Sequence, residues 1–545
     1  MLVHNGKIKS TFIFFIFCLV YGIITVNLYF TQIVQREHFQ KLAQRQYKVT
    51  IVQQPPRGII YDRHKKPIAL NKDSIAAFIL PHKIENPIAL KKFLQTNFPQ
   101  AYERLQKKDA KYFMYVKRKL TQHEINLIEQ SNITDIKFIK EPNRFYPLPC
   151  LGTMLGITDI DNKGISGLEL HHNELLSGAA STYILEKDAR SSLFYFQKEV
   201  AKEGKAGQSL TLTIDSDLQF LAHEELVEFV HKLQAKEGSV LIMDGVNGDI
   251  LAMTSYPDFN PNDVTNLNME QTKNKLITES YELGSVMKIH VALALLSEGV
   301  VTIDELIDCE NSKETVIDGM HFTTVHPDGI IPFSKVLVDS NNIGMVKVTK
   351  RLGPKLIDHY KRMGFGKKTG IEFPGEQAGY VNPAHKWSKR SIISLSFGYE
   401  ITATLLQLAA AAGIIANNGC KLTPRLLLNA EPKAEQERLY PEEVIQQIKA
   451  IMKETVDAGT AKRARIKGYT IMGKTGTANM VIDGKYSKEH NVYTFEGIIE
   501  KDNYKRIIIT FIKDSPLKHL YAANTTAPLF EKIAEKMLIH EKIVI

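Results

Sequence analysis

Ser285 and Lys288 form a Ser-x-x-Lys pair within the segment YELGSVMK. On a helix, a separation of three residues places the lysine ammonium one turn from the serine hydroxyl, on the same face. A serine hydroxyl becomes a nucleophile when a base removes its proton, and a lysine can be that base where burial and nearby cations lower its pKa. A serine at a helix start is more often only a cap, so the pair needs further residues to define an acyl-transfer site.

A second set of polar residues, Ser340, Asn341 and Asn342, precedes the apolar helical run IGMVKV. A hydroxyl can relay a proton to a leaving amine, and an amide can hold both a lysine and a substrate carbonyl. An ordinary turn or helix cap is the alternative interpretation of the same triplet.

The third set is Lys474, Thr475, Gly476 and Thr477, in GKTGTA directly after the strand-like YTIM. If these residues lie on a strand beside the nucleophile, Lys474 and Thr475 can hold a substrate carboxylate. Gly476 would then permit close approach of the acyl group.

A nucleotide-binding P-loop is the rival interpretation, because the segment from Gly468 to Thr475 has the full P-loop spacing. A P-loop needs an apolar strand before its first glycine and a helix after its Lys-Thr pair. Here the basic KRARIK precedes Gly468, and the turn-prone GTAN follows Thr475. Residues 469–472 are also bulky where a phosphate cradle requires a small, open loop. The context therefore favours the strand.

The elements that must position these sets begin near Asp215, where strands start to alternate with amphipathic helices. Residues 238–244 and 248–255 predict a β-hairpin that opens the catalytic sheet. Helices are predicted over residues 285–298 and from Pro441 onward. Later strands are predicted over residues 469–472, 494–499 and 506–513, so the sheet should combine both ends of the domain.

The apolar run from Thr11 to about Val34 is long enough to cross a membrane as one helix. It is too long for a cleaved signal peptide and ends without a small-residue cleavage site, so an uncleaved anchor is expected. Lys7 and Lys9 favour a cytoplasmic N-terminus, but Arg36 beyond the run weakens this orientation.

The composition excludes several other classes of function. Among 545 residues the formal net charge is +9, and the basic residues are spread through the chain, which argues against a nucleic-acid role. The four cysteines, Cys18, Cys150, Cys309 and Cys420, lie far apart and suggest neither a disulfide framework nor a zinc site. No metal or other cofactor is predicted.

In their order along the chain, the three sets resemble the signature of penicillin-binding proteins and class A β-lactamases. Upstream stretches, PPRGIIYDRHKKPIAL and GISGLELHHNELLSG among them, are similar to the pedestal motifs of the class B penicillin-binding proteins. The pedestal residues that carry this likeness are Arg57, Gly58, Asp62, Arg63, Arg144, Tyr146, Pro147, Gly167, Leu168 and Glu169. The resemblance covers nearly the whole chain after the anchor.

The resemblance implies a multidomain α+β fold with an N-terminal transmembrane helix, an elongated mixed α/β pedestal and a transpeptidase domain. The transpeptidase domain should contain a central antiparallel five-stranded sheet flanked by helices. The expected parts are a cytoplasmic tail (1–10), the anchor (11–33), a dimerisation-type pedestal (34–214) with a head insertion at about 73–140, and the transpeptidase domain (215–545).

The implied activity is that of a serine D,D-transpeptidase, which crosslinks peptidoglycan stem peptides ending in D-Ala-D-Ala through an acyl-enzyme and releases the last D-Ala. β-Lactams would be covalent inhibitors. The implied site residues are the nucleophile Ser285, its base Lys288, the relay and positioning pair Ser340 and Asn342, the carboxylate-binding Lys474 and Thr475, Gly476, and the oxyanion-hole N–H groups of Ser285 and Thr477.

Four residues depart from the family pattern: His290, Asn341, Glu400 and Leu405. Chain length and YELGS favour the division (septal) type, with elongation as the alternative. The septal type implies an extracytoplasmic catalytic domain and, as membrane partners, a polytopic glycosyltransferase and other divisome proteins. A β-lactamase or β-lactam sensor and a non-enzymatic scaffold are the competing hypotheses from other classes.

Overall fold

The computed structural model describes residues 2–53, 55–107, 113–187, 194–317, 319–324, 327–428 and 437–543. By its internal contacts the chain divides into two compact units. One unit is Met1–Pro56 with Ser177–Gly207, and the other is Arg57–Leu176 with Gln208–Ile545.

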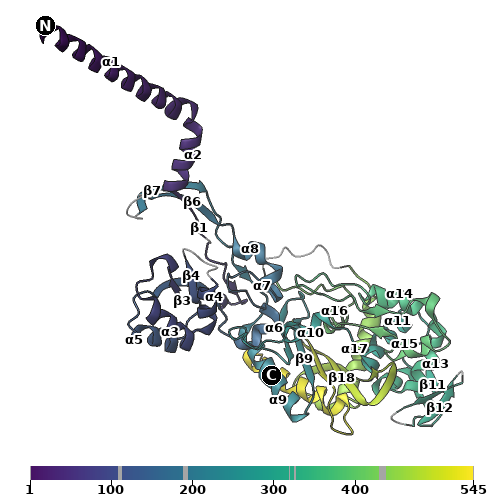
Figure 1. The fold of residues 1–545 in the computed structure, drawn as a ribbon. Helices are drawn as coiled ribbons and strands as arrows, with labels where there is room; N and C mark the ends of the chain where they lie inside the picture. Colours follow the sequence, from purple (N-terminus) through teal and green to yellow (C-terminus); the bar gives the residue numbers. More distant parts are fainter. Residues whose placement is uncertain are drawn as a thin grey trace. The chain divides into compact units, whose positions relative to one another are not determined.

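The first unit begins with the predicted apolar helix, the purple segment labelled α1 in Figure 1 (Leu2–Tyr29). A π-helical turn (Phe30–Val34) and α2 (Arg36–Tyr47) follow it. Among the described residues, Ile8–Val34 is the one stretch long and apolar enough to cross a membrane, and none of its most apolar part is buried. The unit also contains an antiparallel sheet in the order β1 (Lys48–Gln53), β6 (Ser181–Lys187), β7 (Phe194–Lys202).

The long strand β3 (Pro67–Ile79) organises the first part of the second unit. It pairs with β2 (Ile60–Tyr61), β4 (Met114–Lys117) and β5 (Lys137–Phe145), and β2 pairs with β8 (Leu210–Thr211). At one end of β3, helices α3 (Pro87–Asn97), α4 (Pro99–Gln106) and α5 (Gln122–Gln130) enclose a small separate core. The short helices α6 (Gly152–Leu155), α7 (Gly167–His171) and α8 (Asn173–Ser177) follow.

A buried ion cluster joins three distant segments of this region. The Glu169 carboxylate accepts hydrogen bonds from Nε of Arg57 (2.7 Å) and Nε of Arg144 (2.6 Å), and all three side chains are buried. Nη1 of Arg144 donates to the Gly58 carbonyl. The two arginine side chains thus share one carboxylate, and the pedestal motifs meet in a single contact. Removing any one of the three charges would leave the others buried without compensation.

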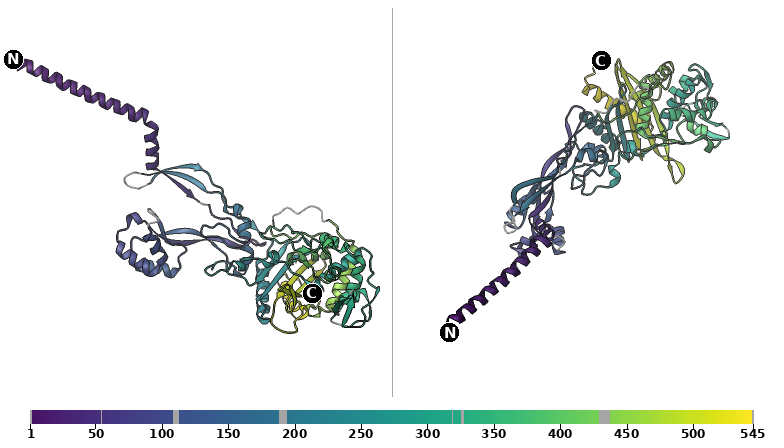
Figure 2. Two further views of the ribbon diagram at one scale, coloured as in Figure 1. Left: turned by 45° about the vertical axis from the view of Figure 1, so that its right-hand side comes forward. Right: turned by 90° about the horizontal axis from the view of Figure 1, so that it is seen from above.

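The main sheet of the second unit's C-terminal part has five antiparallel strands in the order β10-β9-β19-β18-β17. Their bounds are β9 (Glu237–Asp244), β10 (Ile250–Tyr256), β17 (Thr470–Ile482), β18 (Lys485–Lys501) and β19 (Tyr504–Lys513). Early teal and late yellow segments lie side by side in both views of Figure 2, because β9 pairs with β19. The predicted α+β class and the sheet built from both ends of the domain are confirmed.

Strand β17 is longer than the predicted strand at residues 469–472. It continues through Ile482 and includes the GTAN segment that looked turn-prone. Pairing with β18 is continuous from Thr470 opposite Glu500 to Asn479 opposite Asn491, and this ladder overrides the weak local preference of glycine and asparagine.

Helices cover both faces of the sheet (Figure 1). Helices α9 (Ser216–Lys232) and α18 (Thr526–His540) pack on one face. Helices α11 (Lys288–Ser297), α16 (Leu405–Ala416) and α17 (Glu442–Asp457) pack on the other. Helices α11 and α16 are buried almost all round, as expected for helices that are apolar on every side.

The remaining elements surround this second face. They are α10 (Lys275–Thr278), α12 (Phe333–Val338), α13 (Asn342–Leu352), α14 (Lys355–Arg362), α15 (Ser391–Ser396), β11 (Leu306–Asp308), β12 (Glu314–Ile317), β13 (Met320–Thr323), β14 (Ile330–Pro332), β15 (Tyr380–Val381) and β16 (Ile401–Thr402).

Candidate active site

Ser285 lies on a 3₁₀ turn, Gly284–Met287, and not in the first α-helical turn. The helix predicted over 285–298 therefore begins later, and Lys288 is the first residue of α11. Ser285 lines a groove of about 360 Å³. The predicted spacing is kept, because residues three apart also share a face of a 3₁₀ turn.

Strand β17 lies directly against this turn. A Cβ added at Gly476 would be 2.5 Å from the Leu283 carbonyl oxygen and 2.8 Å from the Val286 nitrogen. A Cβ at Gly284, whose φ is +62°, would be 2.7 Å from the Thr477 carbonyl oxygen. This close approach requires glycine at both positions. The third set of residues therefore lies on the edge strand of the sheet, next to Ser285.

The hydroxyl of Ser340 lies between the two lysines. Lys288 Nζ donates to Ser340 Oγ (3.2 Å), to the Ser340 carbonyl (2.8 Å) and to Asn342 Oδ1 (2.6 Å). Lys474 Nζ donates to the same Ser340 Oγ (3.0 Å) and to the Thr475 carbonyl (3.2 Å). Both lysines are fully buried. The structure thus brings the three sequence sets together around one hydroxyl.

Asn341 has a structural role within the second set. Its side-chain oxygen accepts from the Gly344 amide and caps α13, while its Nδ2 donates to Asp328 (2.9 Å). Ser340 has φ +57°, and this left-handed residue turns its side chain and that of Asn342 toward Lys288. The middle residue is therefore the helix cap, and its two neighbours contact Lys288.

Burial changes the proton affinity of both ammonium groups. It lowers the pKa of Lys288 well below its usual value, and the nearby charge of Lys474 adds to this decrease. Burial also lowers the pKa of Lys474, to about 7, against the opposing effect of Glu496. A lysine whose pKa is lowered loses its proton at lower pH than an exposed lysine does, and its neutral form can accept a proton.

The two threonines of the third set have their hydroxyls engaged. Thr475 Oγ1 is 3.0 Å from Thr460 Oγ1, and Thr477 Oγ1 accepts from the Ala522 amide (3.1 Å). Thr477 lines the groove together with Ser285. The strand is the sheet edge, so it presents unpaired backbone groups on this side.

Sequence reasoning assigned no role to several aromatic and polar residues of the groove. They are Thr323, Ser394, Phe397, Tyr399, Asn479 and Tyr486. The Tyr399 hydroxyl accepts from the Asn479 amide (3.0 Å), and its ring meets that of Tyr486 edge-on at 5.0 Å. The stretch SFGYE contains two of them, but nothing in its spacing indicates that it reaches β17.

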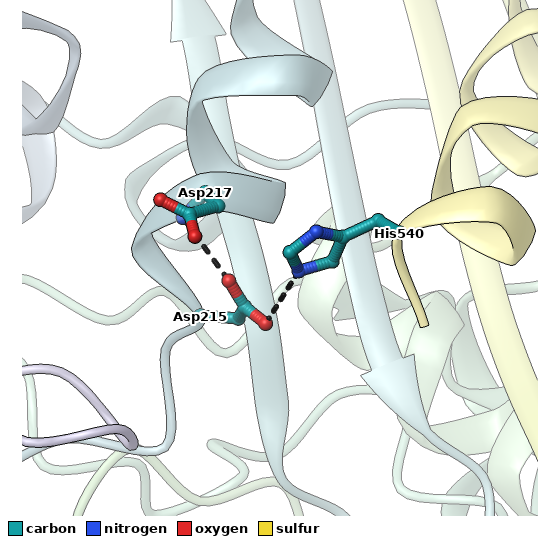
Figure 3. Close-up of side chains that lie close together, drawn as sticks. All are labelled: Asp215, Asp217 and His540. Carbon is teal, nitrogen blue, oxygen red and sulfur yellow. Dashed lines mark hydrogen bonds and ion pairs between the residues drawn. The ribbon is translucent and has the colours of Figure 1, made fainter. Parts of the chain in front are cut away.

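Among the described residues, one cluster has the donor types of a metal site: Asp215, Asp217 and His540 (Figure 3). His540 Nε2 is 3.0 Å from the Asp215 carboxylate, and His64 Nε2 is 3.2 Å from the same oxygen. Lys66 donates to Asp217 (2.5 Å). Protein cations and imidazoles already pair with these carboxylates, so the cluster is a structural ion network at the start of α9.

Comparison with family models gives two matches. The model for the penicillin-binding protein transpeptidase domain matches residues 238–535, and the model for the penicillin-binding protein dimerisation domain matches residues 52–212.

Curated proteins show the same relationship. The chain is 32% identical to the probable peptidoglycan D,D-transpeptidase PbpC of Pseudomonas aeruginosa, over 88% of this chain and 85% of the relative. It is 28% identical to the peptidoglycan D,D-transpeptidase FtsI of Escherichia coli K12, over 88% and 82%, and 27% identical to stage V sporulation protein D of Bacillus subtilis, over 99% and 87%.

Among solved structures, penicillin-binding protein 3 of Mycobacterium tuberculosis in its apo form has the same fold. Its TM-score is 0.70 at 23% identity, over 90% of this chain and 98% of the other.

Proposed function

The chain belongs to the penicillin-binding protein transpeptidases and is a peptidoglycan D,D-transpeptidase of the class B type, and from this we propose an acyl-enzyme mechanism at Ser285. The observation that carries the proposal is the Ser340 hydroxyl, which contacts Lys288 and Lys474 beside the groove that Ser285 lines.

In the first half-reaction, neutral Lys288 accepts the proton of Ser285 as Oγ attacks the carbonyl of the penultimate D-Ala. Backbone N–H groups of Ser285 and Thr477 stabilise the developing oxyanion; one such donor is worth about 3–4 kcal/mol of barrier. Ser340 then passes a proton to the leaving amine of the terminal D-Ala and regains one from protonated Lys288. The products are the Ser285 ester and free D-Ala.

The remaining residues of the site bind the donor. Protonated Lys474 and the Thr475 hydroxyl hold the terminal carboxylate. Asn342, held by its contact with Lys288, positions the substrate amide. In the second half-reaction an acceptor amine attacks the ester, and the same relay returns the proton to Ser285.

The lining of the groove supports transfer over hydrolysis. A hydrolase needs a base that activates water. Among the described residues that line the groove, none is a carboxylate or a histidine. The acyl-enzyme is therefore expected to persist until an amine arrives, and a β-lactam adduct is expected to turn over slowly.

Release of D-Ala from a synthetic donor ending in D-Ala-D-Ala tests this mechanism in the detergent-solubilised full chain. Ser285→Ala is expected to abolish release. Ser297→Ala is the matched control, because Ser297 lies at the far end of α11 and its hydroxyl donates to the Ala294 carbonyl. Release by Ser285→Ala at the rate of this control would refute the mechanism.

We also propose a septal role, with a single membrane span and the catalytic domain outside the cytoplasm. The similarity to FtsI and the apolar segment Ile8–Val34 support this assignment. A polytopic glycosyltransferase and other divisome membrane proteins are the proposed partners. Depletion in the native cell is expected to give undivided filaments, whereas rounded cells would indicate elongation.

A further inference from the structure

Two ionisable side chains lie behind the lysines and have no part in the reaction above. His290 lies on α11, two residues after Lys288, and Glu496 lies on β18, directly opposite Lys474. His290 Nε2 is 3.0 Å from a Glu496 carboxylate oxygen, and both side chains are fully buried. A buried pair of this kind is costly unless other charges or hydrogen bonds compensate it.

The unpaired atoms of this pair indicate its protonation. His290 Nδ1 and Glu496 Oε1 have no hydrogen-bond partner among the described residues. The imidazole also meets the ring of Phe365, edge-on at 5.6 Å. A neutral imidazole leaves only an acceptor unpaired at Nδ1, whereas an imidazolium would bury an unpaired N–H. The geometry therefore favours a neutral His290 that donates from Nε2 to an ionised Glu496.

The compensating charge for Glu496 is Lys474. Residues directly opposite on antiparallel strands share a face, with Cβ atoms about 4.5–5.5 Å apart. The negative charge of Glu496 raises the pKa of Lys474 against the effect of burial, and the positive charge of Lys474 lowers the pKa of Lys288. Glu496 thus acts on the base through the second lysine.

Other ionisable groups on the neighbouring elements are engaged elsewhere. The recorded pairs are Lys449 of α17 and Lys505 of β19 with Glu500, His359 of α14 with Glu298, and Lys347 of α13 with Glu310. Helix α16 carries no ionisable side chain. Among the described residues, the pocket therefore contains the two lysines that share the Ser340 hydroxyl, Lys288 and Lys474, and the His290–Glu496 pair.

We propose that Glu496, held by His290, is a positioning residue that keeps the proton on Lys474 and leaves Lys288 as the neutral base. The inference rests on the proposed acyl-enzyme mechanism and concerns the same site. Neither residue is among the described residues that line the groove, so the role is exerted through the lysines.

The pH dependence of penicillin acylation tests the proposal in the detergent-solubilised full chain. In the wild type, the rate should rise as Lys288 loses its proton and fall as Lys474 loses its own. Glu496→Gln removes the charge but keeps the shape. It should move the alkaline limb to lower pH by on the order of one unit, the lower end of the effect of an opposite charge within about 4–6 Å. The acid limb of the profile should move to higher pH, because a proton that Lys474 holds less tightly is more readily held by Lys288.

Two further variants separate charge from structure. Glu500→Gln is the matched control, because Glu500 lies on the same strand and carries the same charge beside a buried lysine, Lys449, but is not opposite Lys474. It should leave both limbs in place. His290→Leu should shift them as Glu496→Gln does, and His290→Gln, which keeps a donor near the carboxylate, should restore the wild-type profile.

Each outcome bears on the proposal. An unshifted profile in Glu496→Gln, or an equal shift in Glu500→Gln, would overturn it. If His290→Gln shifts the limbs as far as His290→Leu, the neutral-donor assignment is wrong. If Glu496→Gln does not fold, the double variant His290→Leu/Glu496→Val, which removes both polar groups, replaces it. The two limbs of its pH profile should shift as predicted for Glu496→Gln, and unshifted limbs would overturn the proposal. A wild type that penicillin does not acylate would overturn the acyl-enzyme mechanism itself, whereas acylation with unshifted variants overturns only this inference.

Discussion

At Gly476, strand β17 packs against the 3₁₀ turn that contains Ser285, and replacement of this glycine by alanine perturbs the contact directly. The added Cβ would lie 2.5 Å from the Leu283 carbonyl oxygen and 2.8 Å from the Val286 nitrogen. Both are backbone atoms and cannot rotate away. Since ordinary contact begins at 3.4 Å, strand and turn must separate by roughly an ångström.

This separation would move the Thr477 backbone away from Ser285, so the two N–H groups proposed as oxyanion donors would no longer lie at their proper distance. A misplacement of about 1 Å costs on the order of 100-fold in rate, which corresponds to about 2.7 kcal/mol of barrier. We therefore expect Gly476→Ala to be acylated by a fluorescent penicillin about 100-fold more slowly than the wild type.

The second-order rate of acylation measures this effect, and the unfolding midpoint shows whether the variant is folded. Gly329→Ala is the matched control, because a Cβ at Gly329 meets no atom within 4 Å, and its rate should equal that of the wild type. If folded Gly476→Ala is acylated within about threefold of the wild type, a difference below about 0.7 kcal/mol, close packing of the strand does not position Ser285.

Four further predictions follow from the same structure. Glu169→Ala leaves two buried arginines without their carboxylate and should lower the free energy of unfolding by about 3–5 kcal/mol in chemical denaturation; an unchanged midpoint would contradict the ion cluster. Ser340→Ala should slow acylation by about 10²–10⁴-fold without preventing reversible penicillin binding; a normal rate would remove the relay. Acylation should rise with pH as Lys288, whose pKa is lowered, becomes neutral. The KM for carboxylate-bearing donors should rise above about pH 7, because Lys474, with a pKa of about 7, then loses its charge; a donor without the carboxylate should show no such rise.

Much of the fold was predictable, because its signals are local. The hairpin at 238–255 and the helix after Pro441 follow from apolar periodicity and turn residues, and the structure has β9, β10 and α17 there. The three residue sets were predicted to meet, and the Ser340 hydroxyl joins them. Their roles in catalysis remain proposals.

The features that were not predicted depend on residues that are distant in the sequence. The length of β17 is set by its ladder with β18, which overrides the local character of GTAN. The 3₁₀ turn at Ser285 packs against Gly476, nearly two hundred residues away. His290 was recognised as unusual, but its partner Glu496 lies 206 residues further along the chain, and no local pattern links the two.

The most direct measurement of the central claim is the site of covalent attachment. The detergent-solubilised chain is incubated with penicillin, digested and mapped by mass spectrometry. A single adduct is expected on the peptide that contains Ser285, and it should be lost in Ser285→Ala and retained in Ser297→Ala. An adduct on any other residue, or an adduct that survives in Ser285→Ala, would contradict this claim.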